Sequence, residues 1–577
     1  MNLRKKRWMV TGAALAMVAS LGLSACGGSS SSGGGQATNS ETGKNEVTMA
    51  SRTPNWIFPI SAKGYTQGEN GQFIQAMYRP LFAYKSTSET PYKINLPKSL
   101  GTVPEVSEDG LTYTIKLRDD AKWSDGTPVT TRDIEFWWNL VTNNKDEWAS
   151  YKKGFFPDGA DLKIIDEHTF SITTETKFAP AWFIDNQINK VALLPQHAWD
   201  KTSADETVSD LDRTPEGAQK VFAYLQGEAK NLSSYATNPL WQTVNGPWKL
   251  AEFTPDQGLK LVPNENYVGD EKPQNDGVTF VFYNSMDAAY NDLKAGNVDV
   301  LDAVPSSAMA SYQQTFAGTS VNEPYAGIMT LTIPQYLDHF KGEEGKLRRQ
   351  AISMAINRDE ITSTIYAGAR TPAKDFTAPT LPGYSNSLPG SDVLTYNETK
   401  AKELWAQADA IAPWDGTFEI AYNSDGGHKE WVDAAANSIK NTLNIDAQGK
   451  AIVDFKTLLQ QEDDQTIGAA FRSGWQGDYP SIYNFLQPLY VTKAASNKGD
   501  YSNPEFDALI TKAAGAANAD EATTAMQQAQ EILLQDLPVI PLWYYNVNGA
   551  WSKNVSNVTF DWRGQPMLSE ITKNASK

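Results

Sequence analysis

Cysteine is almost absent from this chain of 577 residues, because Cys26 is the only one. A single cysteine excludes an intramolecular disulfide, so burial of apolar side chains must stabilise the fold. Histidine is also scarce, and its four copies lie outside helical or hairpin spacing of one another: His168, His197, His339 and His428. This spacing argues against a metal site built on clustered histidines. We expect no metal and no other cofactor.

Sequence motifs of common enzymes are missing as well. The chain contains no G-x-S-x-G, H-E-x-x-H, G-x-x-x-x-G-K-[ST] or G-x-G-x-x-G. Ser150 and Lys153 match S-x-x-K, but one match to so short a pattern is expected by chance. A carboxylate run at residues 462–464 is typical of a solvated face. These absences favour a protein that binds a ligand without transforming it, although a distant pair of catalytic carboxylates, as in glycosidases, would leave no local motif.

Basic residues are too few to form a broadly positive surface, because the formal net charge is −18. Residues 1–25 hold four basic side chains and no acidic one, so their removal would shift the charge to −22. The negative net charge argues against a nucleic-acid partner. Beyond the N-terminal region no apolar run approaches bilayer length, so the body of the chain is not expected to span a membrane. Its size of about 550 residues predicts two or three domains.

The N-terminal residues predict where the protein works. A basic segment at residues 4–7 precedes an uncharged apolar stretch at residues 8–23, and small residues lead directly to Cys26. This order resembles a secretory signal that ends in a bacterial lipobox. Gly and Ser dominate residues 27–35, which is typical of a flexible linker. We expect a lipoprotein signal peptide at 1–25, and a lipid anchor on Cys26 with a flexible linker over 26–45.

Aromatic residues are abundant, with 17 Trp, 24 Tyr and 22 Phe. Most are expected in the core, because aromatic side chains bury large apolar areas. An aromatic-lined cleft that captures a small organic ligand is a second interpretation. Composition alone leaves both open.

Short strand patterns alternate with amphipathic helices, which is typical of α/β architecture. Alternating apolar residues over 111–117 predict a strand, and Thr130 with Asp133 predicts a capping box that opens a helix. Glycine at position 296 is expected to end another helix over 286–295. Further predicted elements are a hairpin around 254–258, extended chain at 297–301, helices at 347–356 and 521–534, a helix capped by Asn397, and a strand-like run at 537–545.

Five segments together resemble the extracellular solute-binding proteins of peptide ABC importers, the oligopeptide- and dipeptide-binding type. They occur in that family's order and spread over most of residues 46–577. The segments are D-G-L-T-Y-T-I within 109–130, N-G-P-W at 245–248 with N-x-x-Y-x-G at 264–269, L-R-R-Q-A-I within 347–358, W-Q-G-D-Y-P at 475–480 and Y-S-N-P-E-F-D at 501–507.

The resemblance implies an α/β fold of the two-lobed, periplasmic-binding-protein-like (Venus flytrap) kind, with an extra subdomain inserted in the first lobe. Two crossover segments would form a hinge, and the ligand would lie between the lobes. The implied boundaries are 46–82, 246–318 and 536–577 for lobe 1, 83–245 for the inserted subdomain, and 319–535 for lobe 2.

The resemblance also implies a ligand site. Asp478 matches the position that pairs with the α-ammonium group of a peptide, and Arg472 lies six residues earlier, as does an arginine that grips the carboxylate of short peptides. Trp475, Tyr479 and Trp148 are assigned to the cleft with them. A site for many peptides should bind the charged ends that all peptides share. The alternatives are that Asp478 caps the next helix, that Arg472 lies on a solvated face, and that the tryptophans belong to the core.

The resemblance implies the substrate-binding subunit of an ABC importer, which captures short peptides and delivers them to membrane permease subunits. Such a protein is not an enzyme, and we expect it to be a monomer. We also expect acyl chains such as palmitate on Cys26 to anchor it at the extracytoplasmic face of the cell membrane. The alternatives are an oligosaccharide-binding member of the same family, whose Trp and Tyr faces would stack on sugar rings, a surface enzyme of glycosidase type, and a receptor that serves no transporter.

The anchor prediction has a direct test. Cys26→Ala should leave the protein unprocessed at the lipobox or should release it without lipid. Fractionation and mass spectrometry of the N-terminal peptide measure both results. Equal membrane retention of the variant, with no lipid detected on the wild type, would contradict the prediction.

Overall fold

The computed structural model describes residues 45–574, except 63, 66, 85–93 and 152–155. Cys26 and the predicted signal peptide lie outside the described residues, so their assignment stays a prediction. None of the helices in the described part is both long enough and apolar enough to cross a membrane.

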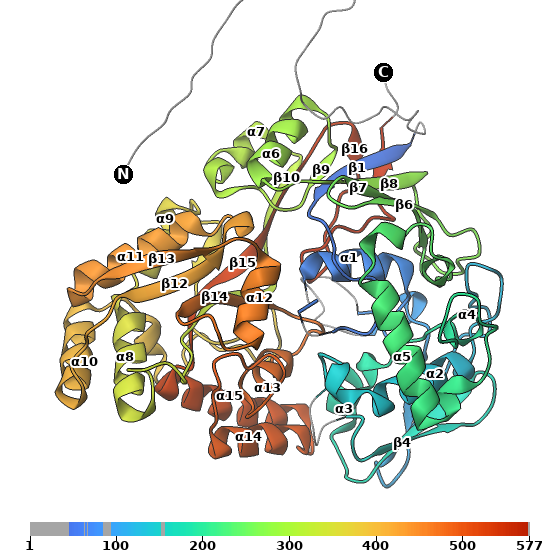
Figure 1. The fold of residues 1–577 in the computed structure, drawn as a ribbon, viewed down its shortest axis with the longest axis horizontal. Helices are drawn as coiled ribbons and strands as arrows, with labels where there is room; N and C mark the ends of the chain where they lie inside the picture. Colours follow the sequence, from blue (N-terminus) through green and yellow to red (C-terminus); the bar gives the residue numbers. More distant parts are fainter. Residues whose placement is uncertain (1–44, 63, 66, 85–93, 152–155, 575–577) are drawn as a thin grey trace, which may run out of the picture. The chain divides into compact units, whose positions relative to one another are not determined.

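An eleven-stranded mixed sheet runs through the described chain (Figure 1). Its order is β13 (Ala447–Ile452), β12 (Phe418–Asn423), β14 (Ala470–Gln476), β10 (Ser320–Thr332), β15 (Val539–Trp551), β9 (Val300–Leu301), β1 (Glu46–Ser51), β8 (Gly277–Phe282), β7 (Gly258–Pro263) and β6 (Trp248–Thr254), with β11 (Arg370–Pro372) paired to β15.

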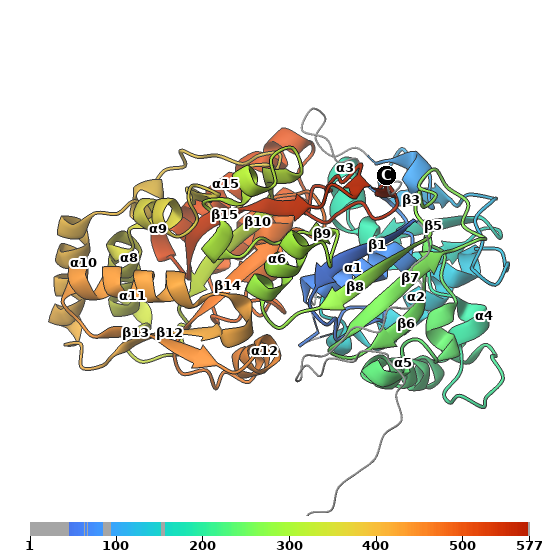
Figure 2. The same ribbon diagram turned by 90° about the horizontal axis from the view of Figure 1, so that it is seen from above.

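Strands β10 and β15 carry the chain between two groups of elements, which lie on either side of them in Figures 1 and 2. We call β1 and β6 to β9 the first lobe, together with α1 (Gly68–Met77), α6 (Met286–Ala295) and α7 (Tyr312–Thr315). The second lobe comprises β11 to β14 with α8 (Gly342–Ala355), α9 (Arg358–Thr364), α10 (Glu398–Ile411), α11 (Lys429–Leu443), α12 (Phe455–Asp463), α13 (Tyr483–Tyr490), α14 (Pro504–Ala514) and α15 (Ala519–Asp536).

A second sheet forms the centre of what we call the inserted subdomain. Its order is β2 (Glu105–Val106), β3 (Thr112–Lys116), β5 (Thr169–Thr174) and β4 (Ala160–Ile164). The subdomain's helices are α2 (Thr131–Asn143), α3 (Pro180–Asn186), α4 (Gln196–Trp199) and α5 (Pro215–Ala229). A short ladder of β16 (Val555–Ser556) and β17 (Thr572–Lys573) lies near the end of the chain. The residue boundaries predicted for the lobes stay a prediction.

The pairing of β10 with β15 is interrupted where the chain passes between the lobes. Residues 320–324 of β10 pair with residues 546–550 of β15, and pairing resumes at Ile328 opposite Tyr544. Residues 325–327 are left out of this ladder. Such an irregularity bends a strand locally and loosens its pairing, so this short segment is where the sheet can flex.

Local sequence signals set several of these elements. The capping box of Thr130 and Asp133 opens α2 as predicted, and Asn397 caps α10 through the backbone N–H of Lys400. Gly296 ends α6 with a φ of 79°, which a glycine adopts without steric cost. By contrast, α8 begins at Gly342, earlier than the predicted 347, because its first turn carries Glu343 and Glu344. Acidic side chains there stabilise a helix N-terminus without adding to the apolar stripe.

Much of the aromatic content is core. Among the residues that the structure describes, eight tryptophans are fully buried: Trp56, Trp123, Trp137, Trp199, Trp241, Trp248, Trp431 and Trp543. Many of them meet edge to face, such as Trp199 with Trp241 and Trp431 with Trp543, whose ring centroids are 5.4 and 5.2 Å apart. The core interpretation of the aromatic composition is therefore confirmed for these residues.

Candidate functional site

A cavity of about 1210 Å³ is lined by residues of both lobes and of the inserted subdomain. This volume exceeds the usual range for drug-sized ligands, roughly 300–1,000 Å³, and leaves room for an extended ligand. Its charged lining residues come from every part of the described chain, and they include Arg52, Glu69, Lys190, Arg370, Glu462, Arg472, Asp478 and Arg563. All five residues that the sequence assigned to the site line this one cavity: Asp478, Arg472, Trp475, Tyr479 and Trp148.

Asp478 lies in the turn that follows β14, and its side chain is accessible from the cavity. Asn484, on α13, donates a hydrogen bond of 3.0 Å from its Nδ2 to Asp478 Oδ2, and its Oδ1 accepts one of 2.8 Å from the Asp478 backbone N–H. The same Oδ1 accepts a bond of 3.0 Å from Trp475 Nε1. Asn484 therefore orients both the carboxylate and the indole.

The Asp478 carboxylate makes no ion pair of 4.0 Å or less with any residue that the structure describes. Burial raises its pKa above the usual value, while the bond from Asn484 and the nearby charge of Lys190 oppose this shift. The alternative that Asp478 caps the next helix is wrong, because α13 has Ile482 at its N-cap and no side-chain cap. The geometry presents an oriented carboxylate that is exposed to the cavity and can accept a cationic donor.

Arg472 lies on β14 opposite Leu331 of β10 and is half-buried, so a solvated face is not its environment. Its Nε donates a bond of 2.8 Å to Asn423 Oδ1, and its guanidinium stands 4.3 Å from the centroid of the Phe455 ring. Burial lowers its pKa, and the nearby Tyr545 and Glu462 oppose that shift. The strand from Arg472 to Gln476 spans roughly 13 Å, since an extended chain rises about 3.3 Å per residue. The cation and the Asp478 anion are thus placed at separate points along the cavity.

The three aromatic candidates differ in how much they offer to a ligand. Trp475 is half-buried and presents part of its ring to the cavity. Tyr479 and Trp148 are only 4% and 5% exposed, so each is largely core with one edge on the cavity. Trp148 also packs edge to face on Trp137, at 5.7 Å and 87°. The core alternative therefore describes most of the Trp148 side chain, and its role as a ligand contact stays a prediction.

Sequence reasoning missed Asn484 and Lys190, the two polar residues that bear most directly on Asp478. They come from different parts of the chain, and packing of α3 against α13 brings them together: the rings of Trp182 and Tyr483 meet edge to face at 4.8 Å. No local motif marks such a contact. An asparagine six residues after Asp478 was the only signal in the sequence.

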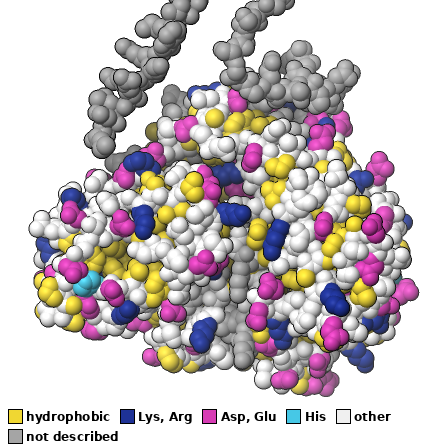
Figure 3. Space-filling model, viewed as in Figure 1, with side chains coloured by type: hydrophobic (Ala, Val, Ile, Leu, Met, Phe, Trp, Pro, Cys, Tyr) yellow, Lys and Arg dark blue, Asp and Glu magenta, His cyan; other side chains and the backbone are white. Residues whose placement is uncertain are grey.

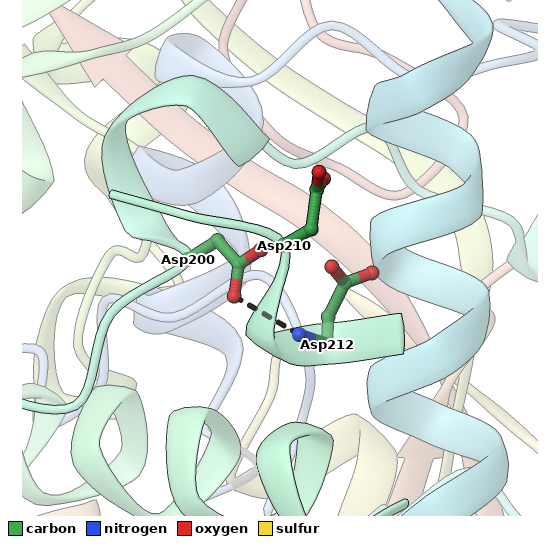
Figure 4. A group of neighbouring side chains, drawn as sticks. All are labelled: Asp200, Asp210 and Asp212. Carbon is green, nitrogen blue, oxygen red and sulfur yellow. Dashed lines mark hydrogen bonds between the residues drawn. The ribbon is translucent and has the colours of Figure 1, made fainter. Parts of the chain in front are cut away.

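A group of three carboxylates, Asp200, Asp210 and Asp212, lies apart from this cavity in the inserted subdomain (Figure 4). Their oxygens lie within 4.8 Å of one another, which is close enough for a metal site. Arg132 already faces the group, because its guanidinium donates to Asp212 Oδ2 at 2.9 Å and to Asp210 Oδ1 at 3.0 Å, and lies 3.6 Å from Asp200 Oδ2.

Hydrogen bonds within the group fit a structural role. The Asp212 N–H donates to Asp200 Oδ1 at 3.1 Å, the bond drawn in Figure 4. Burial, and then the bond to Asp212, raise the pKa of Asp200 to about 7. Burial would raise the pKa of Asp212 too, but the hydrogen bonds with Arg132, Asp200 and Asn139 and the charge of Arg132 together outweigh burial, so the pKa is lowered. Arg132 thus supplies the charge that balances the acids, and we assign the group to subdomain stability.

On the face of the molecule shown in Figure 3, acidic and basic side chains are interspersed. The two signs mix over this face although the whole chain carries a net charge of −18. This distribution provides no broad basic region there for a polyanion.

A family model described as bacterial extracellular solute-binding proteins, family 5 Middle, matches residues 93–497. The chain belongs to this family. The predicted family and the predicted two-lobed α/β fold are thereby confirmed, since the similar solved structures described next cover nearly the whole chain.

Curated relatives share modest identity over long alignments. The oligopeptide-binding protein OppA of Bacillus subtilis is 23% identical, over 97% of this chain and 98% of its own length. The dipeptide-binding protein DppE of the same organism is 25% identical, over 76% of this chain and 77% of its own.

Solved structures show the same fold. The murein tripeptide-binding protein MppA of Escherichia coli superposes with a TM-score of 0.74 at 20% identity, covering 92% of this chain and 98% of that one. Haemophilus influenzae OppA in complex with RPPGFSPFR gives a TM-score of 0.73 at 18% identity, covering 92% and 98%.

The role assigned to Arg132 predicts a large loss of stability on its removal. Arg132→Met leaves the buried carboxylates of Asp200 and Asp212 facing one another without a counter-ion, so the free energy of unfolding should fall by about 3–5 kcal/mol. Arg213→Met is the matched control, since Arg213 is 52% exposed and pairs with Asp210 at the rim of the same group; it should cost less than about 1 kcal/mol. Urea denaturation measures both variants, and equal losses would contradict the assignment.

Proposed function

We propose that this protein is the substrate-binding subunit of an ABC importer and that it captures short peptides in the cavity between its lobes. The observation that carries this proposal is the Asp478 carboxylate, which is exposed to the cavity, oriented by Asn484 and free of an ion pair among the described residues. Its position suits the α-ammonium group that every unmodified peptide carries. A charge-assisted bond in such surroundings is strong and directional.

Arg472 supports the proposal at the other end of the ligand. Its guanidinium faces the same cavity and is placed to attract a carboxylate, although Glu462 close by offsets part of its charge. The relatives whose names state a ligand bind oligopeptides, dipeptides or murein peptides. The part of the cavity that the peptide backbone would not fill leaves water-filled space for peptide side chains of different size. The site can therefore accept many peptide sequences.

The other parts of the proposal follow from the family and the N-terminal sequence. Delivery to ABC permease subunits fits a binding protein of this family. A lipid anchor on Cys26 would hold the folded body near the extracytoplasmic face of the cell membrane, as a monomer. Ligand capture without chemistry fits the family, because the curated relatives of this chain are named as binding proteins.

A contact between Asp478 and the peptide α-ammonium predicts that removing either group changes the effect of removing the other on the binding free energy. Asp478→Ala would leave the α-ammonium of a bound peptide without its counter-ion, a loss of about 3–5 kcal/mol. This loss corresponds to at least a hundredfold weaker binding, since each decade is about 1.4 kcal/mol. An N-acetylated peptide should bind the wild type poorly, and the substitution should weaken it little further.

Calorimetry on the four combinations of protein and peptide measures this double-mutant cycle. Asp119→Ala is the control, because that carboxylate is 67% exposed and lies outside the cavity lining; it should leave affinity unchanged. Additive effects would show that Asp478 does not meet the ammonium. A wild type indifferent to acetylation would instead favour the oligosaccharide alternative.

A further inference from the structure

Lys190 is a cation in the cavity whose charge has no direct counter-ion in the described part of the chain. It ends the short 3-10 turn Ile188–Lys190 of the inserted subdomain and lines the cavity. Its Nζ donates one hydrogen bond, of 3.2 Å, to Gln187 Oε1. No described carboxylate lies within ion-pair distance of it. An ammonium group has three donors, so two remain for a ligand or for water.

The second lobe brings Asp478 near this ammonium without direct contact. Helix α3, just before Lys190, packs on α13 through Trp182 and Tyr483, and Asn484 next to Tyr483 holds the Asp478 carboxylate. Burial lowers the pKa of Lys190 to about 8, and the one charge that opposes this shift is that of Asp478. The two groups therefore share one corner of the cavity.

Ligand binding changes the charge balance in this corner. If the α-ammonium of a ligand pairs with Asp478, that carboxylate is occupied by a second cation. Lys190, which is half-buried, then keeps a charge without a counter-ion. Arg563 is the other cation whose charge lowers the pKa of Asp478. Its own charge already has a counter-ion, because its Nε donates to Asp561 Oδ2 at 2.8 Å. A buried charge is tolerated best when it is paired and hydrogen-bonded. A carboxylate on the ligand itself would supply the missing partner.

We propose that Lys190 forms an anion subsite beside Asp478, which selects peptides with an acidic side chain in their first or second residue. This inference rests on the proposed function, since it takes the peptide amino end to lie at Asp478. Lys190 is then a residue that determines specificity, whereas Asp478 provides the contact that all unmodified peptides share.

The test compares alanine-based tri- to pentapeptides that carry Glu or Gln at position 1 or 2, all with a free amino end. Of the two Glu peptides, the one that wild type binds more tightly should bind at least tenfold more tightly than the peptide with Gln at the same position, as measured by calorimetry at pH 7. In Lys190→Met this ratio should fall to about one, mainly through weaker binding of the Glu peptide. A loss of fold would weaken both peptides alike, so the ratio reports the subsite and not stability.

Lys498→Met is the matched control, because Lys498 also lines the cavity but its ammonium is bonded to Asp463; it should keep the wild-type ratio. Equal affinity of wild type for Glu and Gln peptides would overturn this inference, and so would a ratio that Lys190→Met does not change. In both cases sensitivity to N-acetylation would still support peptide binding at Asp478. Failure of every peptide to bind would overturn the proposed function and this inference with it.

Discussion

The structure depends on two strands that belong to both lobes. Strands β10 and β15 pair along most of their length, and the interruption at residues 325–327 lies between two well-paired stretches. Tyr325 and Tyr545 stack there at 5.8 Å, with their planes within 13°. Gly327 is required beside them, since a Cβ at this position would lie 2.5 Å from the Tyr325 ring and 3.1 Å from the Tyr545 ring. Both lobes are thus tied to one sheet, in which the ladder of β10 and β15 shifts register at residues 325–327 and again between Met329 and Thr330.

This constraint explains where the ligand site forms. Arg472 and Asp478 belong to β14 and the turn after it, and β14 pairs directly with β10 from Gly327, the last residue of the interruption, onward. A bend at the interruption would move them relative to the first lobe and to the inserted subdomain. A ligand that contacts both sides stabilises the closed arrangement, because it binds that arrangement better than the open one. Asp478 belongs to the second lobe and Lys190 to the inserted subdomain, and both line the cavity.

Local signals in the sequence predicted much of the fold, and distant contacts account for the rest. Thr130 with Asp133, Asn397 and Gly296 act within one helical turn, so their effect can be predicted from neighbouring residues. The start of α8 could not be predicted in this way, because its polar first turn lacks the apolar pattern. Five segments in a known order predicted the family, and the resemblance to that family implied the five site residues that line the cavity. Lys190 could not be predicted, because it comes near Asp478 only through the packing of α3 on α13. Asn484 lies on α13, six residues after Asp478, but no motif marks its bond to that carboxylate.

The account is tested most directly by native mass spectrometry of protein purified without refolding, followed by sequencing of any ligand that it retains. The account predicts a mixture of short peptides whose amino ends are free and which exchange with added peptide. Retained carbohydrate, or peptides that are all blocked at the amino end, would contradict the central claim that Asp478 receives the α-ammonium group of a peptide.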